Sequence, residues 1–208
     1  MTCFTLNGKA VISRSSPSTR LSDVLRSEMG LSGTKIGCNA GDCGACSVLL
    51  DDAPICSCLT TVAQVGGASV TSIEGLNTEN IISKLQESFL AHGAAQCGIC
   101  TPGMMVAAHA LLNNNPTPNR RDVEDALGGI LCRCTGYGKI IEAVLAVNLD
   151  RRAGPLPQVG CSVGIPIRHL DGQSKVDASL LYGDDAAPQD SVMVRVIRSP
   201  HHYASFKI

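Results

Sequence analysis

Residues 36–58, which read IGCNAGDCGACSVLLDDAPICSC, decide how the N-terminal part of this chain folds. Five cysteines fall in this stretch, the first three in the spacing CxxxxCxxC and the last two in a CxC pair: Cys38, Cys43, Cys46, Cys56 and Cys58. Glycines at positions 37, 41 and 44 alternate with the first three. Because glycine accepts positive φ and lets backbone N–H groups approach a bound group closely, the stretch predicts a tight loop around a group held by thiolates.

The spacing of the first three cysteines is typical of plant-type [2Fe-2S] ferredoxins rather than of zinc proteins. A zinc loop also needs less glycine, because zinc brings no inorganic sulfide for backbone N–H groups to approach. We therefore predict a [2Fe-2S] cluster on Cys38, Cys43 and Cys46, with further thiols available at Cys56 and Cys58.

A second group of cysteines stands in the segments QCGICTP, residues 96–102, and LCRCTGY, residues 131–137. These segments supply four thiolates as a CxxC and a CxC pair: Cys97, Cys100, Cys132 and Cys134. Four sulfur ligands serve iron and zinc alike, so the spacing alone leaves both metals open for this site.

The composition argues against several classes of protein. The formal net charge is −1 and no run of basic residues is present, which disfavours nucleic-acid binding. The longest apolar run, Met104 to Leu112, contains His109 and is shorter than the ~18 residues that span a bilayer. The N-terminal MTCFTLNGKAVIS has no basic or apolar signal region. We expect no nucleic-acid partner, no membrane span and a cytoplasmic location.

The eleven cysteines do not indicate disulfides, because their number is odd and they are gathered into motifs in a long chain for which we expect no signal sequence.

The N-terminal third has the pattern of a small sheet with one helix. Residues 2–13 predict a hairpin around Asn7-Gly8, and residues 18–30 predict a helix that Gly30 closes. Strands are expected at Ser47–Leu50 and Ser69–Ile73. This layout predicts a ferredoxin-like β-grasp domain over residues 1–76.

From Glu79 onward the apolar residues recur with a period of about 3.6, which predicts helices. We expect four, at residues 79–92, 102–112, 121–130 and 139–147. Met104 and Met105 then belong to the core rather than to a cofactor site. A four-helix bundle over residues 77–152 would bring the two thiol pairs together in the loops before its second and fourth helices.

From Ala153 the chain becomes rich in proline and glycine, which predicts a linker that wraps rather than packs as a domain. Val192 to Ile197 alternates like a strand, but the residues after the linker are too few for an independent core. An unpaired strand edge invites aggregation unless another polypeptide completes its sheet. The predicted fold is therefore α+β: a β-grasp domain, a four-helix bundle, and an extended tail over 153–208 with a strand that completes a partner's sheet.

Three blocks in this order resemble one known family: GTKIGCNAGDCGACSVLL, QCGICTPGMM and LCRCTGYGKI. Residues 1 to about 150 are similar to the iron–sulfur subunit of the molybdenum hydroxylases, the xanthine dehydrogenase and aldehyde oxidoreductase family. The resemblance implies that the second site is also a [2Fe-2S] cluster, held by Cys97, Cys100, Cys132 and Cys134. It implies as well that the first cluster takes Cys58 as its fourth ligand.

The resemblance also assigns residues that touch the partner's cofactor. It implies that Gln96 and the backbone around Cys134 contact the molybdopterin, in its cytosine dinucleotide form, of a molybdenum-binding large subunit. Cys3, Cys56 and Cys161 are then surplus to the clusters, and we expect them to be small buried apolar residues.

The tail resembles the start of that large subunit, on the following residues: Arg168, Asp171, Lys175, Val176, Tyr182 and the RSPH segment from Arg198 to His201. The segment VDASLLYGDD departs from the small-residue pattern usual there. This resemblance implies an iron–sulfur subunit fused to the first piece of the molybdenum subunit. No flavin domain lies between them, so FAD is absent or lies on a separate subunit.

The resemblance implies an electron-transfer subunit of a molybdenum hydroxylase that acts on an aldehyde or an aromatic N-heterocycle of nicotinate or purine type. Electrons would pass to FAD or another carrier, through the bundle cluster first. No catalytic residue for the substrate is expected on this chain. The alternatives are the same role in a CO dehydrogenase or an aromatic acyl-CoA reductase of the family, and a stand-alone ferredoxin-type carrier.

Overall fold

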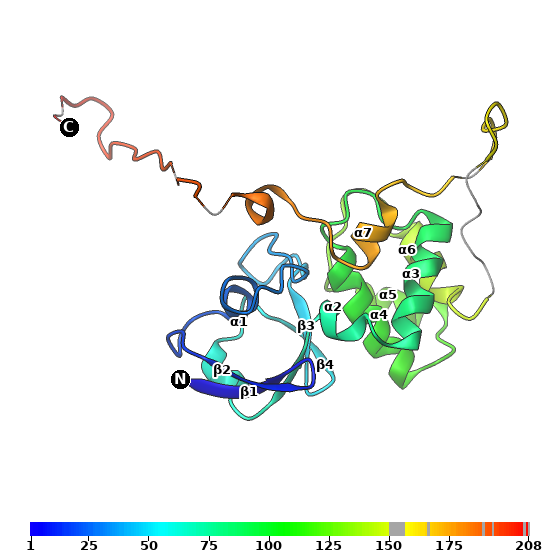
Figure 1. The fold of residues 1–208 in the computed structure, drawn as a ribbon, viewed down its shortest axis with the longest axis horizontal. Helices are drawn as coiled ribbons and strands as arrows, with labels where there is room; N and C mark the ends of the chain where they lie inside the picture. The colour runs from blue at the N-terminus through cyan, green and yellow to red at the C-terminus, as the bar shows by residue number, and fades with distance from the viewer. Residues whose placement is uncertain (150–156, 166, 189, 193, 206, 208) are drawn as a thin grey trace.

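The computed structural model describes residues 1–149, 157–165, 167–188, 190–192, 194–205 and 207. A sheet with one helical segment lies on one side, and a group of helices lies on the other (Figure 1). We call residues 1–71 the sheet lobe and residues 72–149 the helical lobe. The fold is mixed α and β, as the sequence predicts.

The sheet lobe holds a five-stranded sheet in the order β2-β1-β5-β3-β4. The predicted hairpin is confirmed: β1 (Thr2–Leu6) pairs antiparallel with β2 (Lys9–Ser13). Its two turn residues have φ of 50° and 79°, the left-handed values that a type I′ turn requires. Next, β5 (Ser69–Thr71) runs parallel to β1 and antiparallel to β3 (Ser47–Leu50).

The outer strand β4 (Ala53–Cys56) pairs antiparallel with β3 and was not predicted. Its sequence APIC is short and contains a proline, which argues against a central strand. Proline is tolerated at a sheet edge, where its missing N–H faces away from the ladder. The position of β4 at the end of the sheet therefore explains why APIC carries no clear strand signal.

The predicted helix of this lobe is α1 (Leu21–Asp23), continued by a π-helical turn (Val24–Glu28). Gly30, with φ of 70°, ends it as expected. Its apolar face packs on the sheet in a core made of these residues: Phe4, Leu6, Leu21, Val24, Leu25, Val48, Val62, Val65 and Val70.

The expected strand at Ser69–Ile73 is too long by two residues, because α2 (Ile73–Leu76) begins there. Ser72 ends the strand: its N–H donates to the side chain of Asn7 at 2.9 Å, and its hydroxyl donates to Glu74 at 2.6 Å. Ile73 then turns into the core of the helical lobe.

The four predicted helices of the helical lobe are present as α3 (Asn80–His92), α4 (Thr101–Asn114), α5 (Arg120–Leu127) and α6 (Gly138–Leu145). Helix α5 ends three residues earlier than expected, where Gly128 and Gly129 interrupt it. Met104 and Met105 are completely buried in the core, as predicted.

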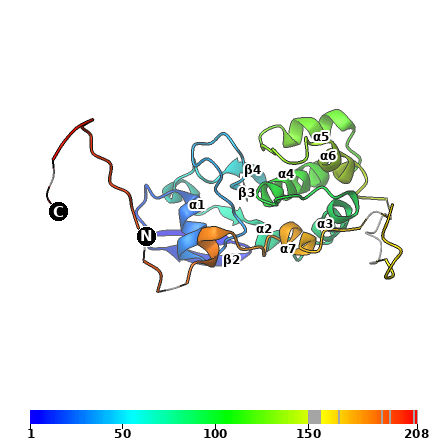
Figure 2. The same cartoon turned by 90° about the horizontal axis from the view of Figure 1, so that it is seen from above.

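The tail differs from the expectation of an extended segment. It forms a short helix, α7 (Gly172–Val176), which packs on α3 and α4 (Figure 2). Val176 and Ala178 are buried in the core of the helical lobe. Part of the linker, residues 150–156, lies outside the described residues. The described residues of 192–197 form no strand within this chain, and their apolar side chains are exposed.

Candidate metal centres

The first candidate centre is the loop of residues 37–46, which the sheet lobe presents beside β3 and β4. Asn39, Gly41 and Gly44 have positive φ, so the loop reverses several times within ten residues. A Cβ atom at Gly37 would lie 2.8 Å from the sulfur of Cys43. Glycine at this position therefore leaves the space in which the thiols gather.

Backbone N–H groups of this loop point at one of its sulfurs. Those of Cys43 and Ala40 lie 3.4 and 3.3 Å from the Cys38 sulfur. These hydrogen bonds lower the pKa of Cys38 to about 7, which favours the thiolate that a metal binds. The loop thus provides the N–H groups that its glycines predict.

Cys46, Cys56 and Cys58 lie next to one another at the inner side of the loop. Burial raises the pKa of Cys58 to about 11, and the neighbouring Cys46 contributes in the same direction. Burial and the same neighbour also raise the pKa of Cys56. Cys58 is fully buried whereas Cys56 is half-buried. Both thiols lie near Cys46, so the assignment of Cys58 as the fourth ligand stays a prediction.

The second candidate centre lies at one end of the helical lobe, where the loop before α4 meets the loop before α6. The four predicted thiols form two close pairs there, Cys97 with Cys134 and Cys100 with Cys132. Burial raises the pKa of Cys100, and burial likewise raises that of Cys97. For Cys132 burial acts in the same direction, but the Thr135 hydroxyl, 3.1 Å from its sulfur, helps to bring the pKa below the usual thiol value.

The donor set of the second centre fits a binuclear cluster. In a [2Fe-2S] cluster each iron takes two of the four thiolates. The two close thiol pairs, Cys97 with Cys134 and Cys100 with Cys132, match that requirement.

The two centres are in direct backbone contact. The N–H of Leu131 donates to the carbonyl oxygen of Cys43 at 2.9 Å. A Cβ at Gly44 would collide with the carbonyl oxygen of Gly129, and one at Gly103 of α4 would lie 2.7 Å from the carbonyl oxygen of Gly44. The missing side chains therefore allow the loop of the first centre to pack against the loop of the second.

The residues expected to meet the partner's cofactor are at the surface. Gln96 and Cys134 are both exposed, in the loops before α4 and α6. Their contact with a pterin stays a prediction.

The expectation that the surplus cysteines are buried is wrong for two of them. Cys3 and Cys161 are exposed, and Cys56 is half-buried. Cys3 lies on the outer face of β1, where its cross-strand partner Ile12 is 57% exposed, whereas Phe4 and Leu6 face inward. All eleven thiols are free.

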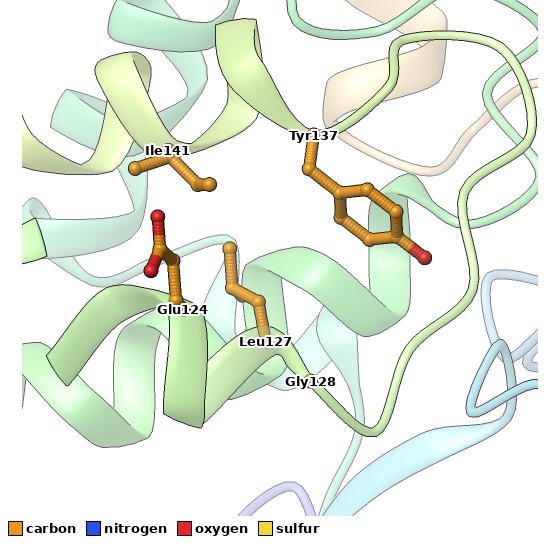
Figure 3. A pocket seen from close by; sticks show the side chains of 5 residues that line it. All are labelled: Glu124, Leu127, Gly128, Tyr137 and Ile141. Carbon is orange, nitrogen blue, oxygen red and sulfur yellow. The ribbon is translucent and has the colours of Figure 1, made fainter. Parts of the chain in front are cut away.

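A mainly apolar hollow of about 340 Å³ lies between α5 and α6, beside the second centre (Figure 3). Leu127 and Ile141 point toward one another across it, and Tyr137 stands at its rim. The hydroxyl of Tyr137 accepts a hydrogen bond from the backbone N–H of Cys132 at 3.0 Å. Tyr137 therefore supports the second loop, a role that the sequence analysis did not detect.

Two family models match the two lobes. The "2Fe-2S iron-sulfur cluster binding domain" matches residues 4–64, and the "[2Fe-2S] binding domain" matches residues 72–145. Each model therefore covers one of the two loop regions described above.

The chain is also similar to whole proteins. It is 45% identical over 151 residues to a probable xanthine dehydrogenase subunit of Bacillus subtilis, and the match covers 73% of this chain and 87% of the relative. The chain belongs to the iron–sulfur subunits of the molybdenum hydroxylases. Members of this group transfer electrons for molybdenum-dependent oxidoreductases, so this molybdenum hydroxylase subunit is part of such an enzyme.

Two solved structures extend the comparison. Quinoline 2-oxidoreductase from Pseudomonas putida has a chain with a TM-score of 0.66 and 43% identity, and the match covers 72% of this subunit and 96% of that chain. Aldehyde oxidoreductase from Desulfovibrio desulfuricans gives a TM-score of 0.83 at 35% identity. That match covers 91% of the subunit but only 22% of the larger enzyme chain, so it includes part of the tail. No helix in the described part of the chain is long and apolar enough to cross a membrane.

Proposed function

We propose that this subunit relays electrons from a molybdopterin centre in a partner chain, through two [2Fe-2S] clusters, to FAD or another acceptor. The cluster of the helical lobe is held by Cys97, Cys100, Cys132 and Cys134, and that of the sheet lobe by Cys38, Cys43, Cys46 and Cys58. The observation that carries the proposal is that each lobe gathers a group of thiols and that the hydrogen bond from Leu131 to Cys43 joins the loops of the two groups.

When bound, each cluster supplies a site that accepts and returns one electron at a time. The residues of the chain hold these sites in place and adjust their environment. Burial of Cys46, Cys58 and Cys100 keeps water from one side of each cluster. Backbone N–H groups at Cys38 and the Thr135 hydroxyl at Cys132 favour the thiolate forms that bind iron.

The exposure of residues at the two sites supports the order of transfer that we propose. In the helical lobe, exposed Gln96 and Cys134 offer a surface on which the pterin of the large subunit docks. In the sheet lobe, Cys38 is exposed whereas Cys46 and Cys58 are buried, so the Cys38 side of that cluster suits exit to an acceptor. Electrons then enter at the helical lobe and leave from the sheet lobe.

The proposed relay divides the chain into three parts. These are a β-grasp domain over 1–76, a helical [2Fe-2S] domain over 77–152, and a fragment of the molybdenum subunit over 153–208. The match to a larger aldehyde oxidoreductase over 91% of this chain supports the last assignment. FAD then belongs on a separate subunit of a cytoplasmic complex, or is absent.

The proposed substrate is an aldehyde or an aromatic N-heterocycle. The same clusters would serve a CO dehydrogenase or an aromatic acyl-CoA reductase, with a different large subunit. A stand-alone carrier is disfavoured by the exposed apolar residues of the tail, Val192, Val194, Val196 and Ile197, because a free carrier gains nothing from them.

The test is metal content followed by activity. Two binuclear clusters require about 4 iron atoms and 4 acid-labile sulfides per chain, and the reduced protein should give two distinct paramagnetic signals. Zinc in place of iron at either site would overturn the proposal. Activity of the copurified complex on aldehydes, compared with nicotinate-like and purine heterocycles, then identifies the substrate class.

A further inference from the structure

One segment of the tail, residues 171–186, touches both lobes. We call it the clasp. Its helix α7 packs on α3 and α4, and its 3-10 turn (Gly183–Ala186) lies beside α1 of the sheet lobe (Figure 2). Asn77 donates to the carbonyl oxygen of Asp177 at 2.9 Å, and Val176 and Ala178 are buried. The clasp is thus anchored independently of any partner chain.

On the side of the helical lobe, the clasp reaches a proposed cluster ligand. The hydroxyl of Tyr182 donates to the carbonyl oxygen of Cys97 at 2.6 Å. The next residue, Gly98, has φ of 90°, and a Cβ there would lie 2.5 Å from the same hydroxyl oxygen. Glycine at position 98 therefore leaves the space that the Tyr182 hydroxyl occupies.

On the side of the sheet lobe, the clasp reaches the segment that leads into the first cluster loop. Asp185 accepts hydrogen bonds from Arg26 and, at 3.4 Å, from Lys35. The side chains of Lys35 and Asp185 are only 2% and 6% exposed. Lys35 lies three residues before Cys38, and its ammonium group also donates to the carbonyl oxygen of Leu180 at 3.0 Å.

The two ends of this network are joined within the clasp. The backbone N–H of Tyr182 donates to Asp185 at 3.2 Å, and the ammonium group of Lys35 lies 4.9 Å from the centre of the Tyr182 ring. These groups line a cavity of about 350 Å³ together with Ile36, which directly precedes the first cluster loop, and Ile99 of the loop before α4. A single, partly buried network therefore spans the approach to both centres.

We propose that Tyr182 and Asp185 are positioning residues for the two clusters, each adjusting the potential of a different one. The proposal rests on the proposed function, because it concerns the same electron relay. Tyr182 acts on the cluster of the helical lobe through the peptide of Cys97. Asp185 acts on the cluster of the sheet lobe by balancing the charges of Arg26 and Lys35.

The two side chains have effects of opposite sign. A reduced cluster carries one more negative charge, so a hydrogen bond that draws electron density from a ligand peptide stabilises it. Loss of the Tyr182 hydroxyl should therefore lower the potential of the helical-lobe cluster. Neutralising Asp185 leaves two nearby positive charges unbalanced, which should raise the potential of the sheet-lobe cluster.

The experiment is a redox titration of the purified full-length chain, followed by the paramagnetic signal of each reduced cluster. Tyr182→Phe should lower the midpoint potential of the helical-lobe cluster and leave the other unchanged. Asp185→Asn should raise the potential of the sheet-lobe cluster. Asp185→Glu, which keeps the negative charge, should leave that potential near the parent value. Tyr203→Phe and Asp190→Asn are the matched controls, because both residues are exposed.

The outcomes separate this inference from the proposed function. If the parent protein lacks two cluster signals, the proposed function fails and the inference fails with it. If both signals are present but Tyr182→Phe and Asp185→Asn shift the potentials no more than the controls do, only the inference is overturned. Shifts of equal size and sign in both clusters would also overturn it, because they would indicate general loosening of the fold.

Discussion

The backbone N–H of Leu131 donates a hydrogen bond to the carbonyl oxygen of Cys43 over 2.9 Å. Cys43 is a proposed ligand of the sheet-lobe cluster. Leu131 immediately precedes Cys132, a proposed ligand of the helical-lobe cluster, so this one bond links the two ligand loops. In the proposed relay, electrons would pass between the two clusters near this contact. The contact exists only because no side chain separates the loops.

Gly44 makes this contact possible, so its replacement should damage it. Gly44→Ala should lower the free energy of unfolding by more than about 1 kcal/mol, because alanine is strained at φ of 64° and its Cβ would collide with the carbonyl oxygen of Gly129. Urea denaturation measures the change. Gly8→Ala is the matched control: it has the same strain at φ of 79° but no atom within 4 Å of the added Cβ. Equal losses in the two variants would contradict the close packing of the loops.

Single replacements should separate cluster ligands from spare thiols. Cys58→Ser should lose the sheet-lobe cluster, whereas Cys56→Ser, Cys3→Ser and Cys161→Ser should keep both clusters. Iron content and the two reduced-state signals measure the outcome. If Cys56→Ser loses the cluster and Cys58→Ser keeps it, the ligand assignment is wrong by two residues.

His109 should make the protein less stable as the pH falls below neutral. Burial lowers its pKa below the ordinary value of 6.5, although Glu79, 3.5 Å away, and Asp52 oppose the shift. The unfolded chain therefore binds more protons, so stability present above pH 6.5 is lost as the pH falls from 6.5 through the lower, folded pKa.

The measurement is the urea midpoint at pH 7.5 and pH 5.5, with cluster content matched. His109→Gln should reduce the difference between the two midpoints, because glutamine does not titrate but can still bond Asn113, which lies 2.8 Å from the ring nitrogen. His201→Gln, at an exposed position of the tail, is the control. If the pH dependence of stability is unchanged in His109→Gln, other titrating groups cause it.

The end of the tail should bind the large subunit without contributing to the clusters. A chain that lacks residues 187–208 keeps the clasp, so we expect both clusters and near-normal stability. Copurification with the molybdenum subunit should weaken or disappear, because the exposed apolar residues from Val192 to Ile197 are lost. Undiminished binding by the shortened chain would show that residues 192–197 are not the contact with the large subunit.

A longer deletion tests the clasp itself. Removal of residues 154–208 takes away Val176 and Ala178 and exposes their apolar partners on α3 and α4. We expect this deletion to lower the urea midpoint more than the 187–208 deletion does. The free energy of unfolding should fall by about 2 kcal/mol or more, as is typical when buried apolar side chains are lost. Equal midpoints in the two deletions would show that the buried clasp does not stabilise the helical lobe.

The sequence by itself determined the features that depend on neighbouring residues. The spacing of Cys38, Cys43 and Cys46 with interleaved glycines identified the first loop, and the Asn7-Gly8 turn identified the hairpin. A period of 3.6 located α3, α4, α5 and α6 within a few residues. These signals are local, because cysteine spacing, turn conformation and helix periodicity are all properties of short segments.

Only the tertiary structure decided the features that join distant segments. Strand β4 and helix α7 have weak local signals and form because β3 and the α3–α4 surface receive them. The burial of Lys35, and the hydrogen bond between Tyr182 and Cys97 across 85 residues, depend on how the two lobes and the tail pack together. The physical reason is that burial and long-range hydrogen bonds are set by which surfaces meet in the folded chain, and no short stretch of sequence contains that information.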